Sequence, residues 1–258
     1  MEIKEFENNI DYFLEQYKDI ESFFKLKESS KSKEDKKKLE KLDLLLAEAD
    51  NYRYERHFIN QGKKIICGVD EVGRGPLCGP VVTCACILPD NFHLEGLTDS
   101  KKLTEKKRDK YYDILTTNKD VHYAIGIVDN KRIDEINILE AAREAMYQAI
   151  SKLDITPDVV LSDAMDLPDL SMPYLSIVKG DYKSESIAAA SVIAKVTRDR
   201  MMYELDKEYP EYGFSKHKGY PTKDHIEAVK KYGVKPFYRF TFSPISEIIN
   251  EGCDNLEK

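Results

Sequence analysis

The sequence has no long apolar segment and few cysteines. No apolar run approaches the roughly 20 residues of a membrane-spanning helix, and the first residues are acidic and lack an apolar core. We therefore expect neither a membrane anchor nor a secretory signal. The 258 residues include 5 cysteines, and no two of them form a Cys-x-x-Cys pair. These absences favour a protein of the reducing cytoplasm over a disulfide-stabilised secreted domain.

An excess of basic charge is also missing, since the net charge is −7. This argues mildly against a nucleic-acid partner, because such proteins usually carry a basic surface. A local basic stripe would nevertheless suffice for phosphate contacts, while clustered carboxylates lower the total charge. The candidates for such a stripe are Lys101, Lys102, Lys106, Lys107, Arg108, Lys179, Lys183, Lys195, Arg198, Lys216 and Lys218.

Glycine and proline are absent before Gly62, which sets the first part of the chain apart from the rest. Apolar residues recur at helical spacing from Tyr12 to Leu26 and again from Leu39 to Leu46, with a polar stretch at 29–38 between them. The pattern predicts a helical hairpin in residues 1–62, which we call the N-terminal extension. A second unit, residues 63–258, would then form the main domain.

Strand-like and helix-like segments alternate throughout the main domain. Strands are predicted at 64–70, 80–88, 121–128, 159–161 and 175–178, and helices at 105–115, 129–153, 184–208 and 222–232. The order predicts an α/β fold with a mixed sheet flanked by helices. Its early strands would form a meander, and its later strands would be joined by helical crossovers.

Acidic residues stand where three predicted strands end. Asp70 and Glu71 follow the first strand, Asp163 follows the fourth, and Asp181 lies just beyond the fifth. Side chains at strand ends of an α/β sheet can converge, and buried carboxylates need a partner such as a hard cation. Two Mg²⁺ or Mn²⁺ ions about 3.5–4 Å apart would satisfy all four and could hydrolyse a phosphodiester. Alternatively, each acid is a capping or turn residue exposed to solvent.

Zinc fits this set of acids less well. Neither a cysteine cluster nor a His-x-x-x-His pair stands beside them. Two further residues, Lys183 and Ser184, begin the helix that follows Asp181, where they could face a phosphate. Ordinary capping of that helix by Ser184 explains the same pattern equally well.

Six motifs, in a fixed order, give the chain a specific resemblance. They are residues 68–76 (Gly-Val-Asp-Glu-Val-Gly-Arg-Gly-Pro), 99–103 (Asp-Ser-Lys-Lys-Leu), 162–164 (Ser-Asp-Ala), 179–181 (Lys-Gly-Asp), 188–200 (Ala-Ala-Ala-Ser-Val-Ile-Ala-Lys-Val-Thr-Arg-Asp-Arg) and 217–222 (His-Lys-Gly-Tyr-Pro-Thr). From Lys63 to its end, the chain resembles ribonuclease HII, the type 2 ribonuclease H family. Minimal members of that family lack a helical extension.

The resemblance implies a ribonuclease H-like fold and hydrolysis of the RNA strand in RNA–DNA hybrids. It also implies cleavage 5′ of single ribonucleotides in duplex DNA, as needed for ribonucleotide excision in replication and repair. Water would attack with the help of two divalent ions, Mn²⁺ or Mg²⁺, and leave 3′-hydroxyl and 5′-phosphate ends. The catalytic and metal-binding quartet would be Asp70, Glu71, Asp163 and Asp181.

Recognition of the RNA–DNA junction would fall to a loop and a tyrosine. The resemblance assigns it to Gly73, Arg74, Gly75 and Tyr220. We expect a monomer in which deletion of the N-terminal extension weakens substrate binding or stability and leaves the metal chemistry in place. One alternative is the related ribonuclease HIII, in which an acid of the quartet differs and the Gly-Arg-Gly-Pro turn is missing. A noncatalytic nucleic-acid-binding module is the other, although acids facing phosphates would not help it.

Overall fold

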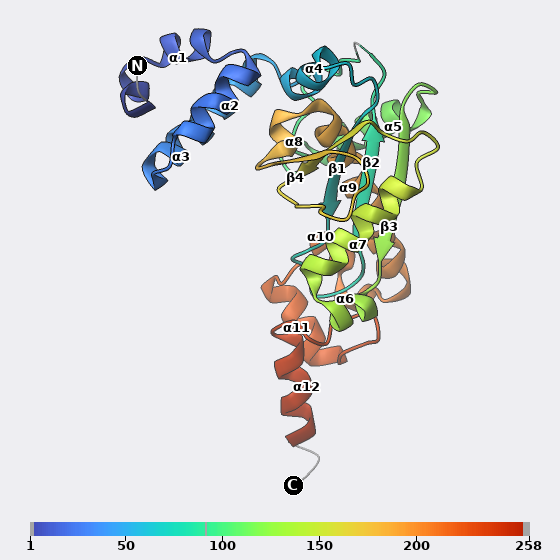
Figure 1. Ribbon diagram of the computed structural model, residues 1–258. Coiled ribbons are helices and arrows are strands. Elements are labelled where there is room, and N and C mark those ends of the chain that lie inside the picture. The colour runs from blue at the N-terminus through green and yellow to red at the C-terminus, as the bar shows by residue number, and fades with distance from the viewer. Residues whose placement is uncertain (1–2, 91, 255–258) are drawn as a thin grey trace.

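A mixed five-stranded sheet lies at the centre of the protein (Figure 1). In this computed structural model, which describes residues 3–90 and 92–254, the strand order is β3-β2-β1-β4-β5. The strands are β1 (Ile66–Val72), β2 (Val81–Ile87), β3 (His122–Val128), β4 (Val159–Asp163) and β5 (Tyr174–Ile177). The first three pair antiparallel, and β4 and β5 continue the sheet parallel to β1. The predicted meander of the early strands is confirmed, and helices join β3 to β4 as expected, but residues 164–173, which join β4 to β5, contain no helix.

Two helices cover the faces of this sheet. On one face α7 (Ile138–Ser151) packs against β1 and β2 through small buried residues such as Ala142 and Ala145. The other face is covered by α9 (Glu185–Glu208), whose buried Ala188–Ala190 run packs against β2. A Cβ atom on Gly68 would lie 2.1 Å from the carbonyl carbon of Ser186. The start of α9 therefore lies directly against β1, close to the acids that follow Gly68.

The remaining helices of the main domain include two at predicted positions, 105–117 and 223–232, and others that the sequence pattern does not indicate. They are α5 (Glu105–Thr117), α6 (Asn130–Ile136), α8 (Gly180–Lys183), α10 (Phe214–His217), α11 (Lys223–Tyr232) and α12 (Ile245–Asp254), with a short 3-10 helix, η2 (Pro210–Tyr212). The prediction of one continuous helix over 129–153 is wrong. Asn137 has φ 67° and ends α6, and its side chain accepts hydrogen bonds from the backbone N–H groups of Leu139 and Glu140 in the first turn of α7.

The N-terminal extension contains more helices than the predicted hairpin. They are the 3-10 helix η1 (Ile3–Asn8), α1 (Ile10–Gln16), α2 (Ile20–Ser29), α3 (Lys33–Ala49) and α4 (Arg53–Asn60). The break between α2 and α3 lies within the predicted stretch 29–38 but is shorter, at 30–32, because Ser32 caps α3 and residues 33–38 form its first turns. The extension has its own apolar cluster, which includes Phe6, Phe13 and Leu42. It lies at one end of the molecule, with α11 and α12 at the other (Figure 1).

The loop between β1 and β2 is held from inside the protein by two arginines. Arg239 is fully buried and donates five hydrogen bonds of 2.6–3.1 Å to the carbonyl groups of Gly73, Arg74, Pro76 and Gly79. Arg198 on α9 donates to the carbonyl groups of Pro80 and Cys78 at 3.0 and 3.1 Å. This loop is therefore a rigid feature of the fold.

Arg239→Met should destabilise the protein strongly. The change leaves four carbonyl groups of the loop, most of them buried, without their donor, and we expect a loss of about 3–5 kcal/mol of unfolding free energy. Urea denaturation measures this loss. Arg132→Met is the matched control, since its exposed side chain pairs with Glu135 and Glu144 on the surface. Equal midpoints for the two variants would contradict a structural role of Arg239.

Among the described residues, no helix combines the length and the apolar character needed to cross a bilayer. Cys67, Cys78, Cys84 and Cys86 are buried free thiols. Cys84 and Cys86 lie on β2 and belong to the core that packs against α9.

Candidate active site

Asp70 lies within a strand rather than at its end. The predicted strand 64–70 extends in the structure through Val72, and Asp70 pairs with Cys84 of β2. On the other side of β1, the parallel pairing with β4 stops at Val69 and Ser162. Asp70 is therefore the first residue of β1 without a partner on that side, which leaves space for other side chains next to its carboxylate.

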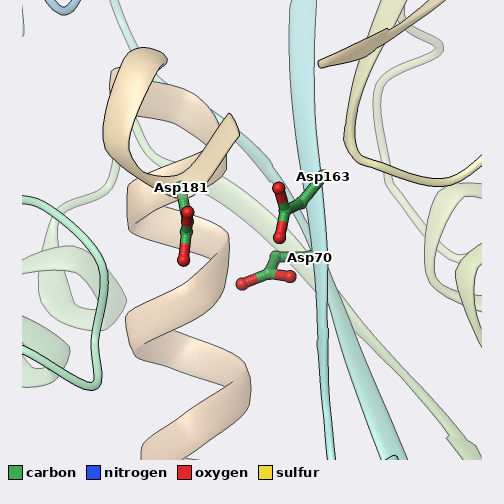
Figure 2. Close-up of side chains that lie close together, drawn as sticks. All are labelled: Asp70, Asp163 and Asp181. Atoms are coloured by element: carbon green, nitrogen blue, oxygen red, sulfur yellow. The ribbon is translucent and has the colours of Figure 1, made fainter. Parts of the chain in front are cut away.

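Asp163 and Asp181 occupy that space. Asp163 is the last residue of β4, and Asp181 lies on the short helix α8 instead of at the end of β5. Lys179 has a left-handed backbone (φ 56°), and the Gly180 N–H donates to Asp163 Oδ1 at 2.7 Å, which turns the chain back toward the sheet. Carboxylate oxygens of Asp70, Asp163 and Asp181 all lie within 4.8 Å of one another. Figure 2 shows the three side chains turned toward a common point.

Glu71 is adjacent to this cluster but not part of it. Successive strand residues point to opposite faces, so Glu71 leaves β1 on the other side from Asp70. Glu71 Oε1 accepts a hydrogen bond from Arg74 at 3.4 Å, whereas Glu71 Oε2 is buried without a hydrogen-bond partner among the described residues. A buried carboxylate oxygen without a donor, next to three convergent carboxylates, fits a hard divalent cation.

The raised carboxyl pKa values at the site also indicate that a positive charge is needed there. Burial, reinforced by Glu71 and Asp163, raises the pKa of Asp70 well above its usual range. Burial also raises the pKa of Asp163, and it raises the pKa of Glu71 and of Asp181 to about 7. Such carboxylates repel one another when ionised, and divalent cations remove that repulsion. A divalent cation held by Asp70, Asp163 and Asp181 would supply the positive charge that these carboxylates lack.

Three residues near the acids were not assigned to the site from sequence. Asp99 lies near Asp181 and raises the pKa of its carboxyl group, Ser191 lies near Asp70 and lowers the pKa of that carboxyl group, and the carboxylates of the site raise the pKa of Lys101. Lys101 had been grouped with the other basic residues, and Asp99 stood out only as part of the motif 99–103. Their position follows from the loop before α5, whose Ser100 hydroxyl contacts the Ser191 hydroxyl of α9 at 2.9 Å.

The residues assigned to junction recognition lie beside one another. Gly73 has φ 103°, and a Cβ atom there would approach Arg198 Nε to 2.5 Å, so glycine is required. The Arg74 side chain is half-exposed and reaches Glu71, which links this loop to the acids. A Cβ atom on Gly75 would lie 3.3 Å from the ring of Tyr220, whose side chain is 36% exposed. Loop and tyrosine thus form one surface next to the carboxylates.

Several of the expected phosphate-binding residues have structural roles. The phosphate-facing interpretation of Lys183 is wrong, because its side chain is buried and paired with Asp43 at 2.6 Å. The capping interpretation of Ser184 is confirmed, since its hydroxyl accepts from the Ile187 N–H. Arg198 is occupied by backbone carbonyl groups, and Lys195 pairs with Asp199 at 2.7 Å. The predicted basic stripe is therefore shorter than the sequence indicated.

Metal binding should stabilise the protein more at high pH than at low pH. The carboxyl pKa values of Glu71 and Asp181 rise on folding from 4.5 and 3.8 to about 7. Without metal, the stability that these protonated groups contribute is complete below the unfolded values and is lost as the pH rises to about 7. Cations need the ionised form. The increase in Tm caused by Mn²⁺ should thus be small at pH 5 and large at pH 8, and a pH-independent increase would contradict binding at these acids.

Comparison with known proteins agrees with this geometry. The family model described as ribonuclease HII matches residues 67–244, so the N-terminal extension lies outside the match. A ribonuclease HII of Acetivibrio thermocellus is 55% identical over 190 residues, which cover 74% of either chain. Ribonuclease HII of Bacillus cytotoxicus is 55% identical over 197 residues, which cover 76% of this chain and 75% of its own.

Solved structures give the same answer for the fold. The crystal structure of ribonuclease H2 from Pyrococcus horikoshii OT3 has a TM-score of 0.62 and 31% identity, and covers 72% of this chain and 98% of its own. Bst-RNase HIII in complex with Mn²⁺ has a TM-score of 0.52 and 16% identity, and covers 73% and 70% of the two chains, which shows a shared fold. The family match and the close relatives favour ribonuclease HII over ribonuclease HIII. The chain belongs to the ribonuclease HII family.

Proposed function

We propose that this protein cuts the RNA strand of RNA–DNA hybrids and cuts duplex DNA on the 5′ side of a single embedded ribonucleotide. Membership of the ribonuclease HII family makes it a metal-dependent endoribonuclease. The observation that carries the finer proposal is that the loop 73–75 lies against the Tyr220 ring through Gly75 and reaches Glu71, the residue after Asp70, through Arg74. A surface that reads the sugar would then adjoin the acids to which we assign cleavage. We assign this activity to residues 63–258.

The four carboxylates supply the ligands for this chemistry. Asp70, Asp163 and Asp181 would hold Mn²⁺ or Mg²⁺ between them, and Glu71 would add its unpartnered oxygen. Two such ions, when bound, supply charge stabilisation on both sides of the phosphorus and favour attack by water in line with the leaving oxygen. The acids fix where the scissile phosphate lies, and the products would carry 3′-hydroxyl and 5′-phosphate ends.

The loop and Tyr220 select the sugar on each side of the cut. A 2′-hydroxyl can both donate and accept hydrogen bonds, and it is the group that separates ribose from deoxyribose. Backbone groups of Gly73 and Gly75 can approach a sugar closely because no Cβ intervenes. The exposed Tyr220 ring, which lies against Gly75, would stack on the next sugar and favour deoxyribose there. Arg239 keeps the loop carbonyls in place for this contact.

Cleavage of a labelled DNA duplex that carries one ribonucleotide tests the proposal. With Mn²⁺ or Mg²⁺ we expect a single cut on the 5′ side of that ribonucleotide, and with excess chelator no cut. An all-DNA duplex of the same sequence should stay intact, and an RNA–DNA hybrid should be cut at several positions. Cleavage of the hybrid without cleavage of the embedded ribonucleotide would reject junction recognition and leave a hybrid-specific nuclease.

A further inference from the structure

The N-terminal extension contacts the helix that carries Asp181. Helix α8 has only four residues, so it cannot hold its own position by internal hydrogen bonds. We propose that the extension is a positioning element of the active site, and that the buried Asp43–Lys183 ion pair holds α8 where Asp181 can bind metal. The inference rests on the proposed function, because the metal matters only if the acids catalyse cleavage. Metal binding itself can be measured without substrate.

The central contact is a buried ion pair between α3 and α8. The Lys183 ammonium donates to Asp43 Oδ2 at 2.6 Å, and both side chains are almost completely buried. The Asp43 carboxylate also accepts from Arg53 Nη1 at 3.1 Å and from the Tyr54 hydroxyl at 2.9 Å. Several donors in fixed directions hold the buried Asp43 carboxylate in one position. The carboxylate in turn holds the Lys183 side chain, and Lys183 is only two residues after Asp181.

The chain that follows α8 is held by α4. Glu55 is buried, and its Oε1 accepts from the hydroxyl groups of Ser184 and Ser186 at 2.6 and 2.7 Å and from the Ser186 N–H at 3.0 Å. The Glu185 N–H donates to the carbonyl group of Asn51 at 3.0 Å. The extension therefore fixes the junction between α8 and α9, where the backbone turns after Asp181.

Two contacts nearer the surface complete the attachment. Lys179, just before α8, pairs with Glu40 at 2.6 Å, and the Tyr182 hydroxyl donates to Glu48 at 2.8 Å. Every residue from 179 to 186 except Gly180 and Asp181 thus has a polar contact with the extension. Gly180 instead contacts Asp163, and Asp181 is left free to point at the other two acids.

Apolar packing joins the extension to the main domain through Ile20, Tyr54 and Ile187, but it is incomplete beside α8. A cavity of about 450 Å³, lined in part by Phe23, Leu39 and Lys183, lies between the extension and β5. An incompletely packed interface constrains position poorly, whereas ion pairs and hydrogen bonds have defined geometry. We expected from sequence that deleting the extension would leave the metal chemistry in place. These contacts favour the other outcome, in which the extension contributes to the metal site.

The test is Mn²⁺ binding by full-length variants in the absence of substrate. Asp43→Asn removes the carboxylate that fixes Lys183, and Lys183→Met removes the ammonium. Titration calorimetry should show a Kd for Mn²⁺ that is roughly 10–100-fold higher in both variants, as for other residues that orient metal ligands. Because they break the same contact, the double variant should bind Mn²⁺ no more weakly than the weaker single variant.

Phe13→Leu is the matched control. Phe13 is fully buried in the apolar cluster of the extension, so this change destabilises the extension without altering a group that contacts α8. It should lower Tm and leave the Kd for Mn²⁺ as in the wild type. Unchanged Mn²⁺ affinity in Asp43→Asn, or an equal loss in Phe13→Leu, would overturn the proposal.

Steady-state cleavage adds a second readout. Asp43→Asn and Lys183→Met should lower kcat at a fixed Mn²⁺ concentration, should recover at higher Mn²⁺, and should change KM for the duplex less than twofold. A raised KM with unchanged kcat would instead make the extension a substrate-binding element and overturn the proposal. Failure of the wild type to cut an embedded ribonucleotide, with Mn²⁺ binding intact, would reject only the proposed function.

Discussion

Asp70→Asn should abolish cleavage while the protein stays folded. Asp70 is buried, it follows the last residue of β1 that pairs with β4, and its carboxylate lies within 4.8 Å of those of Asp163 and Asp181. An amide cannot balance divalent charge, and losing about 4 kcal/mol of stabilisation corresponds to a fall of roughly 10³-fold or more in kcat. Single-turnover cleavage of a duplex with one ribonucleotide, in saturating Mn²⁺, measures this fall.

The same change should not weaken the metal-free protein. Because the pKa of Asp70 is raised by burial and by neighbouring carboxylates, its ionised form opposes folding at neutral pH, and asparagine removes that term. We therefore expect an equal or higher Tm in the absence of metal. Asp154→Asn, at an exposed carboxylate beside His122, is the control and should cut at the wild-type rate. Wild-type rates from Asp70→Asn would reject its role in catalysis.

Changes of the other two acids of the cluster should reduce cleavage to different degrees. Asp163→Asn and Asp181→Asn should both be severely impaired, because each removes a ligand from the group within 4.8 Å. Asp181 lies on the short helix α8, and the carboxylate of Asp99 is nearby. We expect Asp99 to replace part of the lost negative charge when Asp181 is changed to asparagine. Partial recovery in excess Mn²⁺ is thus expected for Asp181→Asn and not for Asp163→Asn.

The central strands could be predicted because their residues carry a local signal. Strand β2 is a buried apolar run, and the start of α9 contains consecutive alanines. The local sequence therefore indicates both that these segments are buried and which is a strand and which a helix. Strand β1 was predicted to end at residue 70 because acids usually end strands. In the structure β1 continues to pair with β2 through Asp70 and Glu71, because β2 extends past the apolar residues of β1 that end at Val69. Long-range pairing of this kind is invisible in the local sequence.

Buried charges were the main features that sequence could not place. Arg198, Arg239 and Lys183 look like surface cations in the sequence, yet each is almost completely buried. Their partners are backbone carbonyl groups or an acid more than a hundred residues away, as for Asp43 and Lys183. Helix α8 was missed for a related reason, because four residues have no detectable helical period. The proximity of the acids was expected, but the elements that produce it were not.

Tyr220→Ala should impair cleavage at a single embedded ribonucleotide without affecting metal binding. The Tyr220 ring is 36% exposed and lies over Gly75, so it can stack on a sugar beside the loop 73–75. Loss of one stacking contact worth about 1–3 kcal/mol corresponds to a fall of roughly 10–100-fold in kcat/KM. Cleavage of the single-ribonucleotide duplex measures this fall, and calorimetry should give the wild-type Kd for Mn²⁺.

The control for this prediction keeps the ring and removes its hydroxyl. Tyr220→Phe should retain most of the activity, because stacking needs the aromatic face rather than the hydroxyl. A purely structural Tyr220 would give the opposite pattern, with a lower Tm in Tyr220→Ala and an equal loss on all substrates. We instead expect little change in Tm, because a half-exposed ring buries little surface on folding. If Tyr220→Ala cuts the single-ribonucleotide duplex as well as the wild type, the junction is read elsewhere, and Arg74 beside Glu71 becomes the next residue to test.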